Sequence, residues 1–92
     1  MLRPEGKRFV LVQWRDPNGG ATAGSERDLT HAPTIVCTSG WEIRHDASGI
    51  SIGGEFCGDG TYRDITFVLP ELIEELLEVK IVKKRKPQPA TD

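Results

Sequence analysis

The densest group of side chains able to do chemistry lies in one stretch, "TSGWEIRHD", at residues 38–46. His45 followed by Asp46 suggests acid–base catalysis, in which a carboxylate orients an imidazole. Consecutive residues of a strand point to opposite faces, however, so the pair would be separated. Counting by twos predicts two opposite sets: Trp41, Ile43 and His45 against Glu42, Arg44 and Asp46. We therefore expect His45 to be a partly buried residue at a strand end and not a catalytic base.

The same stretch is better suited to ligand binding. Gly40 predicts a bulge or sharp bend, which would leave Trp41 partly exposed beside it. Aromatic rings can stack on a base, and arginines can bind phosphate. The glycine-containing loop over residues 18–25 would act as a lid. The candidate ligand-binding residues are Trp41, Arg44, Arg63, Tyr62, His45, Asn18, Gly19 and Gly20.

Other reactive patterns are incomplete. "GGATAGS" at residues 19–25 has the glycine spacing of a phosphate loop but lacks its lysine. No serine sits in a Gly-x-Ser-x-Gly elbow. Cys37 and Cys57 belong to no Cys-x-x-Cys pair, so we expect reduced thiols, with a disulfide between them as the alternative. We predict no catalytic residues, no metal site and no cofactor.

Composition indicates one small β-rich domain. The chain has 92 residues, is 37% hydrophobic, and contains 10 glycines and 6 prolines, which favour turns. We assign residues 1–82 to a single domain and residues 83–92 to a basic, proline-containing disordered tail. No signal peptide or membrane span is apparent, so a cytoplasmic location in a bacterial host cell is expected.

Charge is unevenly distributed along the chain. The net charge is −2, but residues 1–78 carry seven basic against thirteen acidic side chains, and residues 79–92 carry five against one. An acidic body disfavours broad contact with a nucleic-acid backbone. The basic end could still form a nucleic-acid arm, with a solvated, solubilising end as the alternative.

Alternating apolar residues predict an antiparallel sheet. Four strands are expected, over residues 8–16, 34–46, 50–56 and 61–69. The glutamate-rich stretch "PELIEELLE" starts with proline and carries an apolar stripe, which predicts a short helix over about residues 70–78. A short fifth strand would follow in "VKIVKK". The fold expected is a small SH3-like or Sm-like antiparallel barrel of four to five strands. The alternative is an open antiparallel sheet with the helix packed on one face.

The arrangement of short motifs resembles short phage and prophage small-barrel proteins. The matching elements are "V-x-W-x-D" ending at Asp16, "T-x-G-W-x-I-x-x-D" ending at Asp46, "I-x-I" from Ile50, and "I-x-x-x-L-P" ending at Pro70. The resemblance covers residues 8–82, and "PELIEELLE" departs from it where a shorter turn is usual. It implies a viral accessory protein and carries no catalytic residues.

We therefore expect a non-enzymatic protein that binds and sequesters a ligand or partner, such as a nucleotide immune signal, as an anti-defence sponge. An Sm-like nucleic-acid module and an inhibitor of a host defence protein are the alternatives. The expected partners are a small nucleotide-like ligand or a host protein. Homo-oligomers are also expected, because the first strand is apolar on both faces.

Overall fold

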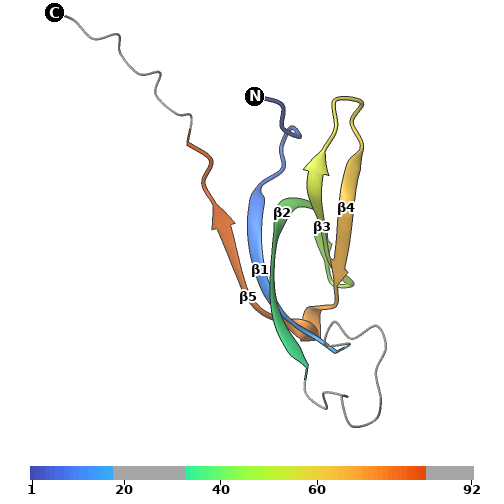
Figure 1. Ribbon diagram of the computed structural model, residues 1–92, viewed down its shortest axis with the longest axis vertical. Helices are drawn as coiled ribbons and strands as arrows, with labels where there is room; N and C mark the ends of the chain where they lie inside the picture. Colours follow the sequence, from blue (N-terminus) through green and yellow to red (C-terminus); the bar gives the residue numbers. More distant parts are fainter. Residues whose placement is uncertain (18–32, 83–92) are drawn as a thin grey trace, which may run out of the picture.

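The protein forms one five-stranded antiparallel sheet. The structure, a computed structural model, describes residues 1–17 and 33–82. Its elements in chain order are β1 (Phe9–Asp16), β2 (Thr34–Asp46), β3 (Gly49–Phe56), β4 (Tyr62–Val68), the single 3₁₀ turn η2 (Pro70–Leu72) and β5 (Ile73–Val79). In space the strands follow the order β4-β3-β2-β1-β5 (Figure 1). The four strands predicted first are confirmed to within one residue at each end. The predicted lid loop and tail lie outside the described residues.

The predicted helix over residues 70–78 is wrong. Only Pro70–Leu72 make a turn, closed by the Leu72 N–H donating to the Leu69 carbonyl at 3.0 Å. From Ile73 onward the chain is extended and pairs with β1. A helix of only nine residues is marginal by itself, and pairing instead satisfies the backbone groups on the second edge of β1. The predicted fifth strand therefore lies earlier than expected, at residues 73–79.

The sheet curls because its two edge strands are neighbours in sequence. Five strands lying flat would hold β4 and β5 about 19 Å apart, at roughly 4.8 Å per strand. Residues 69–72 connect them through a 3₁₀ turn, which rises only about 2 Å per residue. Figure 1 shows the two strands meeting at this turn and spreading apart toward the opposite end. Among the described residues no ladder joins β4 to β5, so the sheet is open.

The curl encloses one face of the sheet, which we call the inner face. Its fully buried side chains are Val10, Val12, Ile50, Ile52 and Val68. Burying such a side chain contributes about 1.5–3 kcal/mol. Trp14 and three residues around the β4–β5 connection, Leu72, Ile73 and Leu76, pack against this cluster. The core therefore joins both edges of the sheet. The opposite side is the outer face.

No helix in residues 1–17 and 33–82 combines the length and apolar character needed to cross a membrane. Pro70–Leu72 is the one helical segment of these ranges, and it is a single turn. Regular structure in the described chain is thus almost entirely strand.

Candidate binding surfaces

A bulge in β2 rearranges the side chains of the 38–46 stretch. The pairing of β2 with β3 shifts register between Glu42 and Arg44, leaving Ile43 as an extra residue. Directly paired residues share a face, and Glu42 and His45 both stand opposite buried isoleucines of β3. The predicted separation of Glu42 from His45 is therefore wrong. His45 Nδ1 lies 3.3 Å from the Glu42 carboxylate.

Gly40 allows a close approach between strands and does not form the predicted bulge. A Cβ at this position would lie 2.5 Å from the Gly53 carbonyl oxygen and 2.7 Å from Cγ2 of Ile52. The expectation that a bend exposes Trp41 is also wrong, because Trp41 is only 8% exposed. Its ring meets Phe9 edge to face, with centroids 5.2 Å apart and an interplanar angle of 87°. Trp41 cannot offer an open face for stacking.

Glu42 is the centre of a charged cluster that the sequence did not indicate. Arg8 donates two hydrogen bonds to its carboxylate, from Nε at 3.0 Å and from Nη2 at 2.7 Å. The Glu42 side chain is only 17% exposed. The hydrogen bond from Arg8 is the main cause that lowers the pKa of Glu42, and it raises the pKa of Arg8 in return. The Arg8–Glu42 ion pair connects the start of β1 to β2.

Arg44 and Arg63 each carry a carboxylate partner. Arg44 Nε donates to Asp46 at 2.7 Å, and Arg63 lies 2.8 Å from Glu55. The pKa of Asp46 is lowered chiefly by the backbone N–H of Ser48 and then by Arg44. Both arginine side chains are largely exposed, at 81% and 70%. Their charges are thus locally balanced and open to water.

The two arginines are not brought together into the predicted groove. Arg44 is paired with Ser51 and Arg63 with Glu55, two positions of β3 that are four residues apart. At about 3.3 Å per residue this is roughly 13 Å along the strand. Arg44 instead borders a shallow hollow of about 300 Å³ that also includes Phe67.

The remaining predicted site residues divide into two groups. Tyr62 is half-buried, with its ring 5.2 Å from that of Phe56 at 50°, and it packs so close to Gly53 that a Cβ there would lie 2.7 Å from a ring carbon. The His45 side chain is 40% exposed. Asn18, Gly19 and Gly20 lie outside the described residues.

A separate groove opens where β1 and β5 part. The two strands pair as far as Phe9 and Val79, and beyond this row the chain diverges on both sides (Figure 1). The cavity there measures about 820 Å³ and is lined by residues 3–9, Trp41 and residues 78–82. We call it the terminal groove. Phe9 is paired with both Trp41 and Val79, so these three form a continuous apolar floor on the outer face.

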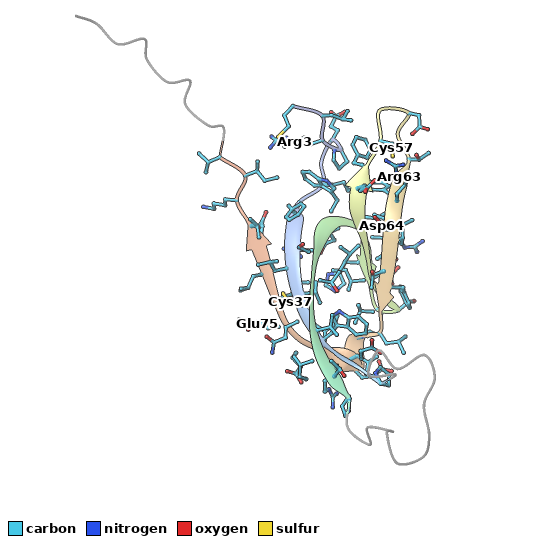
Figure 2. All side chains as sticks on the ribbon, in the orientation of Figure 1. Arg3, Cys37, Cys57, Arg63, Asp64 and Glu75 are labelled. Carbon is cyan, nitrogen blue, oxygen red and sulfur yellow. The ribbon has the colours of Figure 1, made fainter. Side chains whose placement is uncertain are left out.

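The walls of the terminal groove are mainly cationic. Four basic side chains line it (Arg3, Lys7, Arg8 and Lys80) against the two carboxylates of Glu5 and Glu78. Lys7 Nζ donates to the Ile43 carbonyl at 2.9 Å, and Arg8 is held by Glu42. Figure 2 shows Arg3 on the N-terminal segment above the sheet. Sequence reasoning missed this groove because its two sides, residues 3–9 and residues 78–82, are far apart in the chain and are brought together only by the β1–β5 ladder.

Both cysteines are free thiols on different elements. Cys37 is exposed on β2 opposite Gln13, and the Cys57 N–H donates to the Thr61 carbonyl at 2.8 Å in the turn after β3. Figure 2 shows them well apart. Within residues 1–17 and 33–82, no group of three or more His, Cys, Asp or Glu side chains is placed to hold a metal ion.

Comparison with protein-family models, with curated proteins and with solved structures finds no significant match for this chain.

Proposed function

We propose that this protein is a non-enzymatic binding protein that captures a small anionic ligand of the nucleotide class in the terminal groove. The observation that carries this proposal is the combination of an apolar, partly aromatic floor with cationic walls in a cavity of about 820 Å³. Small-molecule sites commonly measure about 300–1,000 Å³ and join apolar surface to a few polar groups. A nucleotide presents both a planar ring and phosphate charge.

The groove divides these roles between its residues. The half-buried Phe9 ring and Val79 would contact the base, while Trp41 supports Phe9 from its edge. Lys7 and Lys80, which both line the groove, would bind phosphate oxygens. Arg44 and Arg63 lie outside the groove lining, and each is already paired with a carboxylate. In this proposal they do not contact the ligand.

We propose that the curled sheet works as a small barrel of the SH3-like kind, sealed at the η2 end by side-chain packing. This proposal is supported by the core, in which Val68 from β4 packs together with Ile73 and Leu76 from β5. Because β4 and β5 pack together only at the η2 end, the opposite end of β5 is free to border the terminal groove.

The phage and prophage resemblance of the sequence supports a specific biological role. Capture of a nucleotide immune signal in the bacterial cytoplasm requires one tight site and no chemistry. A protein of this size acting by stoichiometric binding fits that requirement.

Thermal unfolding of the wild-type protein against a ligand panel tests the proposal. The panel contains cyclic mononucleotides, cyclic dinucleotides, the matching uncharged nucleosides, and inorganic phosphate. A ligand at about 100 times its Kd stabilises the folded state by about 2.7 kcal/mol, which raises Tm by several degrees. We expect such a shift from at least one nucleotide and a smaller one from its nucleoside. No shift from any nucleotide would refute the proposal.

A further inference from the structure

β4 has an edge that no strand covers among the described residues. It is the last strand on its side of the sheet, so alternate N–H and C=O groups along that edge lack a ladder partner. Its outer-face side chains are large and apolar: Ile65 is 60% exposed and Phe67 is 53% exposed. They lie beside the small residues Gly53 and Ser51 of β3, which leave them prominent.

The opposite edge of the sheet differs in charge. Of the seven residues of β5, three are the carboxylates Glu74, Glu75 and Glu78, and none is basic. Figure 2 shows Glu75 beside β5, on the opposite side of the sheet from Arg63 and Asp64. Charged side chains on an edge strand oppose pairing with another chain. β4 carries one charge of each sign, so it lacks this protection.

We propose that β4 is the contact through which a second copy of this chain binds, extending the sheet by antiparallel β4–β4 pairing about a two-fold axis. Asp64 has a φ of 55°, which breaks the regular strand, so the usable edge begins at Ile65. Centring the axis on Thr66 places Ile65 opposite the partner's Phe67, and Thr66 opposite the partner's Thr66. These cross-strand pairs are favourable, and no like charges meet.

The side chains of Ile65 and Phe67 favour a second copy of this chain as the partner at the β4 edge. A two-fold contact requires that a surface be complementary to itself. Ile65 and Phe67 satisfy this by exchanging places across the axis, and each would cover apolar surface that water now contacts. A contact of one strand edge lies at the small end of protein interfaces, so we expect a reversible dimer with a Kd in the micromolar range.

Analytical ultracentrifugation between about 1 µM and about 500 µM tests this proposal. We expect the wild type to approach twice the 10.2 kDa mass of one chain at the upper end. Ile65→Lys and Phe67→Lys should stay monomeric, with circular dichroism confirming that they fold. The matched control is Leu77→Lys, which alters an outer-face residue 51% exposed on β5 and should dimerise like the wild type.

Each other outcome overturns the proposal. A wild-type protein that stays monomeric at the highest concentration refutes the β4 contact between two copies. Loss of the dimer in Leu77→Lys as well as Ile65→Lys would instead indicate β4 pairing with β5 of the next copy. No ligand enters this measurement, so its failure leaves the terminal groove untouched.

Disulfide trapping supplies a readout that does not depend on losing the dimer. In a background lacking the native thiols (Cys37→Ser, Cys57→Ser), we would introduce Thr66→Cys or, as the control, Glu75→Cys. Directly opposite residues of an antiparallel pair have Cα atoms about 4.5–5.5 Å apart, within disulfide range. Mild oxidation should cross-link the Thr66→Cys protein only. Cross-linking of the Glu75→Cys protein alone would contradict the proposal.

Discussion

Glu42 shows how one side chain can join separate parts of this small protein. It accepts two hydrogen bonds from Arg8 and lies 3.3 Å from His45 Nδ1. Its backbone N–H also donates to the Arg8 carbonyl at 2.9 Å. The start of β1, the bulge of β2 and the end of β2 are thus tied at one carboxylate. Lys7, next to Arg8, is held at the edge of the terminal groove by the same arrangement.

Replacing this carboxylate gives a prediction about acid stability. The folded-state pKa of Glu42 is lowered, so its stabilising effect is present above the unfolded pKa and disappears as pH falls through the folded value. We expect Glu42→Gln to cost about 1–2 kcal/mol at pH 7 and to flatten the loss of stability below about pH 5. Urea unfolding across pH measures both effects.

The control is Glu55→Gln, which removes the exposed partner of Arg63. Exposed pairs contribute little, so the change should be within about 0.5 kcal/mol at pH 7. Equal effects of the two substitutions would contradict the central position assigned to Glu42.

Gly40 gives a second prediction at the residue scale. An added Cβ would meet backbone, the Gly53 carbonyl oxygen at 2.5 Å, which cannot move aside cheaply. Gly40→Ala should therefore destabilise the protein by about 1–3 kcal/mol. Gly58→Ala is the matched control, because nothing lies within 4 Å of the added Cβ there. Thermal unfolding that ranks the two variants in the reverse order would refute the close approach of β2 and β3.

Sequence reasoning about single residues succeeded only where a strand was regular. Alternation over β1 places Val10 and Val12 on one face, and both are fully buried. It failed at His45, because a bulge shifts every later residue to the other face and leaves no compositional trace at Ile43. The burial of Trp41 was equally invisible, since it depends on Phe9 in a different strand.

At the scale of elements, β5 shows why a pattern can support two structures. Leu72, Ile73, Leu76 and Leu77 have the spacing of a helical stripe, and the glutamates suit an exposed helix. In the strand, Ile73 and Leu76 both reach the core because the β1–β5 pairing shifts register between Gln13 and Trp14. The strand is favoured over the helix by β1, because the second edge of β1 needs a hydrogen-bonding partner. The helix prediction considered local preference alone, whereas the pairing of β5 with β1 joins residues 59 to 70 positions apart.

A pair of leucines distinguishes the strand from a helix. In β5, Leu76 is half-buried against the core while Leu77 is 51% exposed on the outer face. Leu76→Ala should cost about 2 kcal/mol in the free energy of unfolding, and Leu77→Ala less than about 0.5 kcal/mol. A helix with both leucines in its apolar stripe would make the two substitutions similar in cost, which is the result that would refute the strand.

At the scale of the whole molecule, the curl of the sheet creates the proposed site. The turn over residues 69–72 brings β5 around to the free edge of β1, and this pairing sets Lys80 near the N-terminal segment. The first four strands and their antiparallel arrangement were predictable from turn spacing and alternation, whereas the position of β5 was not. The terminal groove was not, because it is made by segments that are distant in sequence and share no motif.

The central claim is that a nucleotide-class ligand binds in the terminal groove, and isothermal titration calorimetry tests it most directly. The titrant is the nucleotide giving the largest thermal shift, and the proteins are the wild type, Lys7→Gln/Lys80→Gln and Arg44→Gln. Losing a hydrogen bond to a charged group costs about 1.5–3 kcal/mol, or roughly 10-fold to 100-fold in Kd. We predict at least such a loss for the double variant and an unchanged Kd for Arg44→Gln. Loss of binding in Arg44→Gln, with wild-type affinity in the double variant, would contradict the claim.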